Sequence, residues 1–161
     1  MTTKITIKPH LAEYLIGKFP SGDGRPVAVI PSVYSIYWVM YDLLSKRPDG
    51  HHTDHGNLEI ALPSPRRSHE AGGKPVLTYN YISERGAKIL EHRIDIMMKA
   101  ELHDLFDENK HIFHINYIET AYYFTQKYGI TSISIDALIK SYQRYRRDIG
   151  RRTSKRLYRK K

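Results

Sequence analysis

The chain of 161 residues contains no cysteine. Disulfide frameworks, thiolate metal sites, cysteine-containing zinc fingers and cysteine nucleophiles are therefore excluded. No run approaches the roughly 18 to 20 apolar residues of a transmembrane helix, and the N-terminus lacks the apolar core of a signal peptide. These absences predict a soluble, cytoplasmic protein that makes no membrane contact.

Net charge is also missing from most of the chain. The 26 Lys and Arg and the 17 Asp and Glu divide into fifteen of each sign in residues 1–135 and eleven against two in residues 136–161. The formal charge of +9 therefore belongs entirely to the C-terminal segment. Phosphate is the obvious counter-charge for such a segment, so nucleic acid is the predicted partner.

The periodicity of apolar residues predicts an α+β fold with a few short N-terminal strands and a mostly helical remainder. Strands are expected over 4–8, 27–30 and 58–62, and helices over 10–19, 32–46, 83–109, 116–128 and 134–150. We expect a single domain over 1–150, followed by a basic and disordered tail over 151–161.

Two of the expected helices have distinctive apolar surfaces. The 32–46 segment, which Ser32 would cap, is so rich in apolar and aromatic residues that it is predicted to be a central core helix or to be buried by a second copy. A homodimer is therefore expected. The 83–109 segment carries a stripe formed by Leu90, Ile94, Met97, Glu101 and Leu105, which Ala87, Met98, Leu102 and Phe106 flank.

The C-terminal region resembles a helix-turn-helix over residues 117–148. Asn116 with Glu119 has the spacing of a capping box, and Gly129 occupies the place of the turn glycine. Ser134 then caps a second helix, which Gly150 is expected to end. Apolar positions predicted to face the core are Ile118, Ala121, Tyr122, Phe124, Tyr128, Ile130, Ile135, Leu138, Ile139 and Tyr142. Thr125 departs from the motif, which has a small residue there, and a plain helical hairpin is the alternative.

The candidate nucleic-acid-binding residues lie on the outer face of the second helix and in the tail. They are Lys140, Gln143, Arg144, Arg146, Arg147, Arg151, Arg152, Lys155, Arg156 and Arg159. Of these, Gln143, Arg144 and Arg147 are expected nearest the bases, while the tail follows phosphates. The interspersed tyrosines Tyr142, Tyr145 and Tyr158 are expected either to stack on unpaired bases or to pack inward.

A metal site is a weaker candidate in the 48–56 loop. His51, His52, Asp54 and His55 place four potential ligands within five residues, but two flanking glycines offer no rigid support. Asp54 to Asn57 resembles a fragment of HNH nucleases, yet the further His and Asn of that family are not identifiable. No phosphate loop or nucleophile elbow is recognisable either. We therefore expect no cofactor and no enzymatic activity.

Four short segments resemble uncharacterised small proteins of bacterial prophages and conjugative elements. They cover residues 7–14, 56–60, 99–104 and 127–130. The resemblance implies a mobile-element context and supplies no activity or catalytic residue.

The function that the sequence favours is non-enzymatic binding of duplex DNA, for example as a transcriptional or mobile-element regulator. Two other classes stay open, an RNA-binding or ribosome-associated protein and an adaptor whose basic tail meets an acidic partner. A ribbon-helix-helix arrangement, with Lys4, Thr6 and Lys8 facing outward from a strand that pairs with a second copy, is a further alternative.

Overall fold

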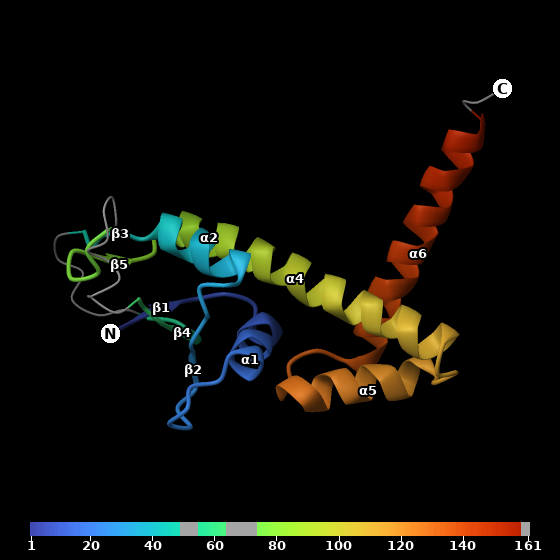
Figure 1. Cartoon of the computed structure of the whole chain (residues 1–161), viewed down its shortest axis with the longest axis horizontal. Helices are drawn as coiled ribbons and strands as arrows, with labels where there is room; N and C mark the ends of the chain where they lie inside the picture. Colours follow the sequence, from blue (N-terminus) through green and yellow to red (C-terminus); the bar gives the residue numbers. More distant parts are fainter. Residues whose placement is uncertain (49–54, 64–73, 159–161) are drawn as a thin grey trace.

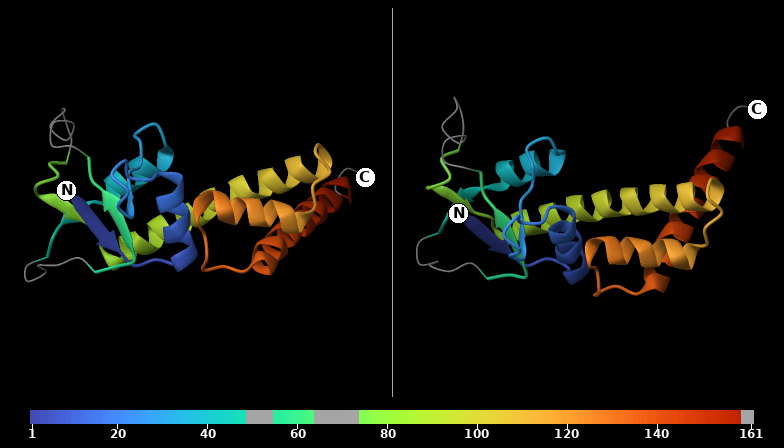
Figure 2. Two further views of the ribbon diagram at one scale, coloured as in Figure 1. Left: turned by 90° about the horizontal axis from the view of Figure 1, so that it is seen from below. Right: turned by 60° about the horizontal axis from the view of Figure 1, so that its bottom comes forward.

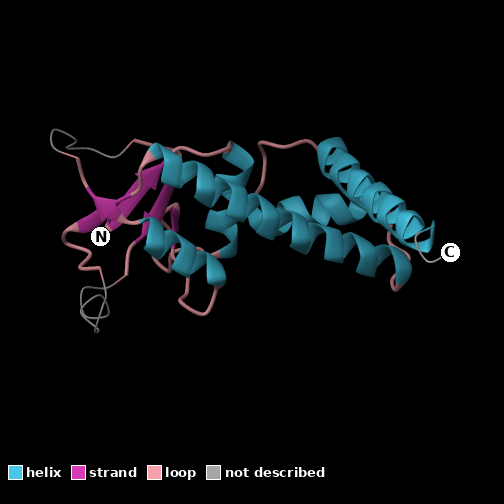
Figure 3. Cartoon of the chain, turned by 90° about the horizontal axis from the view of Figure 1, so that it is seen from above, coloured by secondary structure: helices cyan, strands magenta, loops and turns pink. Residues whose placement is uncertain are grey.

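The computed structural model describes residues 1–48, 55–63 and 74–158 and confirms the α+β class (Figure 1). The strands gather at one end of the molecule, and the helices extend from them (Figure 3). The order of elements is β1 (Thr2–Ile5), α1 (Pro9–Lys18), β2 (Val27–Ala28), α2 (Ser35–Leu43), β3 (Ser45–Lys46), β4 (Leu58–Ala61), β5 (Tyr79–Tyr81), α4 (Glu84–His111), α5 (Tyr117–Tyr128) and α6 (Ile135–Tyr158).

A three-stranded sheet holds the N-terminal part together, with β4 in its centre. β1 pairs with β4 antiparallel, and β2 pairs with β4 parallel. Ile5, Leu58 and Ile60 alternate into the core, as the period of two predicts. β1 is an edge strand of this sheet, and the ribbon-helix-helix family lacks the further strands that it pairs with here. The short β3–β5 pair was not predicted from the sequence.

The long helix α4 is central to the fold, because α1, α2, α5 and α6 all pack against it (Figure 2). Ser83 caps it by accepting a hydrogen bond from the backbone N–H of Gly86 at 3.2 Å. Its 28 residues span about 42 Å. Leu90 and Ile94 are fully buried as predicted, but farther along Leu102 and Phe106 replace Glu101 and Leu105 in the deepest positions.

The helix α2 is shorter and less central than the sequence indicates. It covers Ser35–Leu43, its N-cap residue is Tyr34, and no side chain caps it, so the predicted cap at Ser32 is wrong. The Ser32 carbonyl instead accepts a hydrogen bond from the Trp38 indole at 2.9 Å. Only Ile36 and Met40 are buried in α2, whereas Trp38 is 54% exposed. The central core helix is α4.

The last helix does not end at Gly150, so that prediction is wrong. α6 continues to Tyr158, and residues 151–158 of the expected disordered tail are helical. A single glycine costs a helix only about 1 kcal/mol, which eight further residues without proline can offset. Among the described residues, no helix combines the length and the apolar character needed to cross a membrane.

Candidate nucleic-acid interface

The pairing of α5 with α6 is set by local chemistry at three points. The Asn116 side chain accepts a hydrogen bond from the backbone N–H of Glu119 at 2.8 Å, and the Ser134 hydroxyl accepts one from Ala137 N–H at 3.2 Å. Between the helices, Gly129 adopts a left-handed conformation with φ of 65°, which favours glycine. Both predicted caps and the predicted turn glycine are confirmed.

Most of the predicted core positions of the helix pair are buried. Phe124, Tyr128, Ile130, Leu138 and Tyr142 are each at most 7% exposed. Thr125, the departure from the helix-turn-helix pattern, is buried as well, and its hydroxyl donates to the Tyr122 carbonyl at 2.9 Å.

Two positions of the α5 stripe do not follow the sequence prediction. Ile118 and Tyr122 are 60% and 57% exposed, so their predicted burial is wrong. The buried face of α5 is instead rotated toward Thr120 and Phe124, because both α4 and α1 pack against that side.

The connector between α5 and α6 is held by a carboxylate of α1. The two oxygens of Glu13 accept hydrogen bonds from the backbone N–H groups and from the hydroxyls of Thr131 and Ser132, at 2.6–3.0 Å. Although partial burial raises the pKa of Glu13, these bonds outweigh it and the net pKa is lowered. The helix pair is therefore fixed to the N-terminal layer.

The first half of α6 packs on the C-terminal part of α4 through aromatic rings. Tyr142 stacks on Phe106 with ring centroids 4.8 Å apart and donates its hydroxyl hydrogen to Asp107 at 2.5 Å. Tyr145 stacks on His103 at 4.5 Å. Tyr142 thus packs inward at 2% exposure, whereas Tyr145 rests one side on His103 and stays 39% exposed.

The opposite side of α6 carries the predicted binding residues. Lys140, Gln143, Arg144, Arg147 and Arg151 recur at intervals of three and four, so they share one helical face, which we call the α6 cationic face. All five are exposed and make no hydrogen bond or ion pair with another described residue. Lys140, Gln143, Arg144 and Arg147 alone line a shallow hollow of about 280 Å³. No other described element therefore lines this hollow.

The remaining predicted residues do not all belong to that face. Arg146 points toward α4, where its Nη1 lies 3.6 Å from Asp107 Oδ1. Arg152 is exposed on another side of α6. Lys155 and Arg156 belong to the last turns of α6, and Arg159 falls outside the described residues. The structure thus brings together Lys140, Gln143, Arg144, Arg147 and Arg151.

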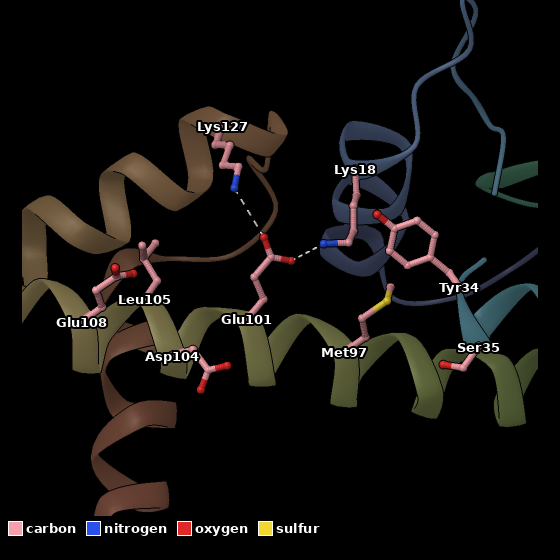
Figure 4. A pocket seen from close by; sticks show the side chains of 9 residues that line it. All are labelled: Lys18, Tyr34, Ser35, Met97, Glu101, Asp104, Leu105, Glu108 and Lys127. Atoms are coloured by element: carbon pink, nitrogen blue, oxygen red, sulfur yellow. Dashed lines mark hydrogen bonds and ion pairs between the residues drawn. The ribbon is translucent and has the colours of Figure 1, made fainter. Parts of the chain in front are cut away.

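A second polar centre surrounds Glu101, which in the sequence only interrupts an apolar stripe. An open pocket of about 550 Å³ lies between α1, α4 and α5, and Lys18, Lys127, Asp104 and Glu108 help to line it (Figure 4). Glu101 accepts hydrogen bonds from Lys18 and from the hydroxyls of Tyr14 and Tyr128, and Lys127 lies 3.5 Å away. The carboxylate tethers three helices.

The protonation of Glu101 follows from these partners. Partial burial raises the pKa of its carboxyl group, but the bonds from Lys18, Tyr128 and Tyr14 outweigh burial and lower it overall. Glu101 is thus an ionised carboxylate whose acceptor positions are already used. Such a group is poorly suited to act as a general base, which needs a pKa near the working pH.

The candidates for metal binding are mostly outside the part of the chain that the structure describes. His51, His52 and Asp54 fall outside the described residues, and His55 is exposed. Within residues 1–48, 55–63 and 74–158, no group of three or more His, Asp or Glu side chains is arranged to hold a metal ion. No protein-family model, no curated protein and no solved structure matches the chain.

Proposed function

We propose that the chain is a non-enzymatic DNA-binding protein that docks the α6 cationic face on duplex DNA. The observation that carries this proposal is a row of cations on one face of α6 that no described residue pairs with. From Lys140 to Arg151 the row extends over about 17 Å. Duplex DNA carries one negative charge per roughly 1.7 Å of its axis, so several phosphates lie within that length.

The shape of α6 favours duplex DNA over RNA as the partner. An α-helix with its side chains is about 10–12 Å wide, close to the roughly 12 Å width of the DNA major groove. The major groove of A-form RNA is too narrow for side chains to enter. The C-terminal half of α6 projects beyond α4, which gives a duplex room to approach (Figure 1).

The residue types on the α6 cationic face suit both kinds of DNA contact. Arg144 and Arg147 are able to bind guanine edges in a bidentate manner, and Gln143 suits adenine. Lys140 and Arg151, at the two ends of the row, are assigned to phosphates. A protein that combines these contacts would fit a transcriptional or mobile-element regulator.

The test is binding of labelled duplex DNA to the full chain and to K140Q/R144Q/R147Q across a salt series. The variant loses one phosphate contact and two base contacts, so it should bind more weakly, and its salt slope should be shallower by about one. A chain that ends at Asp148 lacks only the projecting part of α6. Comparing it with the full chain separates the contribution of that part from the contribution of the packed half. Equal affinity of variant and wild type at all salt concentrations would overturn the proposal.

The choice of duplex separates the remaining classes of function. Random duplex should be compared with the regions flanking the gene for this chain, because a regulator prefers particular sequences. Tighter binding to structured RNA would favour the RNA-binding class. Binding to an acidic protein without any binding to nucleic acid would favour the adaptor class.

Homodimerisation is part of the same proposal. The exposed apolar side chains of the α2 region, Val33, Tyr34 and Trp38, are 85%, 42% and 54% exposed, and a second copy is the occupant we expect. Light scattering should give twice the monomer mass of 18.8 kDa, and Trp38→Ser should lower it. A monomeric mass at high concentration would rule the dimer out.

A further inference from the structure

The first half of α4 carries three cations and a histidine that the charge balance of the sequence conceals. Arg85, Lys88, His92 and Arg93 are exposed, and none makes a hydrogen bond or ion pair with a described residue. We call these four residues the α4 basic face. Two exposed isoleucines accompany them: Ile89 follows Lys88, and Ile96 lies one turn after His92 and Arg93.

The neighbouring acids of α4 are mostly paired with other groups. Glu91 accepts a hydrogen bond from the backbone N–H of Lys8 at 2.8 Å, and its carboxylate lies 3.9 Å from the Lys8 ammonium. Asp95 pairs with Lys99 at 2.6 Å. Glu84 lies at the first turn, where the helix dipole favours a negative charge. Arg85, Lys88 and Arg93 are therefore left without a carboxylate partner among the described residues.

The α4 basic face and the α6 cationic face point to the same side of the molecule. Arg85, His92, Ile96, His103 and Asp107 recur at intervals of seven and four, so they lie along one side of α4. On that side, His103 and Asp107 contact Tyr145, Tyr142 and Arg146 of α6. The α6 cationic face is opposite those contacts and thus points away from α4, as the α4 basic face does.

The spacing of the two faces suits one extended polyanion. His92 precedes His103, where α6 crosses, by eleven residues or about 17 Å of helix. Figure 2 shows α6 lying across the end of α4. A rod-like polyanion that binds α6 and continues toward the sheet therefore runs along the first half of α4.

We infer that the α4 basic face is a second phosphate-contacting surface, which extends the duplex footprint from α6 toward the strands. This inference rests on the proposed function. We assign its contacts to the phosphate backbone, where Arg and Lys make most of their contacts with DNA. The surface therefore adds affinity and orientation without adding sequence preference.

The experiment compares R85Q/K88Q/R93Q with a variant of equal charge, K4Q/K8Q/R25Q, in the full chain. The three control cations already lie beside carboxylates, at 3.4 Å from Glu59, 3.9 Å from Glu91 and 2.6 Å from Asp23. The control variant therefore lowers the net charge by the same amount as R85Q/K88Q/R93Q does, but it removes only cations that already have a carboxylate partner. R85K/R93K keeps the charge and should bind as the wild type does.

Two duplex lengths separate the two surfaces. At 3.4 Å per base pair, about 8 base pairs cover α6, whereas about 16 reach the α4 basic face. On the longer duplex the wild type should lose about 40-fold more affinity than R85Q/K88Q/R93Q between 50 and 200 mM salt. On the shorter duplex the α4 variant should match its charge control.

The outcomes distinguish this inference from the proposed function. If R85Q/K88Q/R93Q and K4Q/K8Q/R25Q bind the longer duplex alike while K140Q/R144Q/R147Q loses binding, the inference is wrong and the proposed function stands. If the wild type binds neither duplex, both are wrong. A glutamate-rich peptide that binds the α4 basic face in place of the longer duplex would also overturn the inference.

Discussion

His103 of α4 is stacked against Tyr145 of α6, with their ring centroids 4.5 Å apart. The imidazole is only 7% exposed, and the Tyr142 ring lies 5.8 Å away. Burial disfavours the charged imidazolium and Lys99 adds repulsion, so the pKa of His103 is lowered from its usual 6.5 although Asp107 and Asp104 oppose the change. The joint between α4 and α6 therefore holds a neutral histidine.

The first prediction concerns the pH dependence of stability. Because the folded-state pKa of His103 is lowered, the unfolded chain binds more protons below about pH 6.5, and the free energy of unfolding falls as the pH falls. His103→Phe keeps an aromatic ring and removes the titration, so its stability should fall less between pH 7 and 5. Urea denaturation at several pH values measures both curves.

The free energy of unfolding of the His103→Phe variant should still fall somewhat as the pH falls, because of His10. Burial and the neighbouring Lys8 also lower the pKa of His10. The double variant H10Q/H103F should therefore be flatter than either single variant. Parallel curves for wild type and His103→Phe would show that His103 titrates normally.

The second prediction concerns the tether at Glu101. Glu101→Gln removes the negative charge that Lys18 and Lys127 share and leaves one amide oxygen for two tyrosine hydroxyls. The Glu101 side chain is 26% exposed, so water compensates only in part. A loss of about 2 kcal/mol in the free energy of unfolding is expected. Chemical denaturation measures it.

A matched control for that change lies one turn away. Asp104 is exposed and makes no ion pair with a described residue. Asp104→Asn changes the charge of α4 equally but should alter the free energy of unfolding by less than about 0.5 kcal/mol. If both variants are equally stable, the Glu101 tether contributes nothing.

The third prediction uses two glycines with opposite surroundings. A Cβ at Gly17 would lie 2.1 Å from the Tyr128 carbonyl oxygen, so Gly17→Ala must separate α1 from α5 and should cost about 3 kcal/mol or more. A Cβ at Gly150 meets no atom within 4 Å, so Gly150→Ala should stabilise α6 by about 0.5–1 kcal/mol. Thermal melting should move in opposite directions for the two variants.

The fourth prediction concerns the attachment of α6. Tyr142→Phe keeps the stacking on Phe106 and removes the hydrogen bond to Asp107, at an expected cost of about 1–2 kcal/mol. Hydrogen exchange should quicken in α6 more than in α4, because α4 keeps its other packing partners. Tyr145→Phe is the control, since no described residue bonds to the Tyr145 hydroxyl. Unchanged exchange in Tyr142→Phe would contradict the role of this bond.

The sequence predicts those parts of the fold that depend on neighbours along the chain. Asn116 and Ser134 cap their helices as expected, and Gly129 forms the left-handed turn, because each acts on residues at most four positions away. Gly150 was misjudged since a glycine inside a helix costs little. The exposure of Tyr122 depends on which side of α5 faces α4, which no local pattern reveals.

The candidate site was only partly predictable for a related reason. The sequence identifies the cations of α6 because no acids accompany them. Residues 1–135 have a net charge of zero, which hides the free cations of α4. Glu13 and Glu101 are each occupied by donors that the fold brings to them. Only the fold shows that no described carboxylate pairs with Arg85 or Arg93.

The carboxylate of Glu13 makes the turn between α5 and α6 depend on a distant part of the chain. An excised fragment of residues 116–158 would leave the N–H groups and hydroxyls of Thr131 and Ser132 to solvent. A graft of this helix pair onto another scaffold would need its own acid at the same place. Synthesis on the ribosome proceeds in the favourable order, because the acceptor precedes Thr131 by 118 residues and has left the exit tunnel before the turn appears.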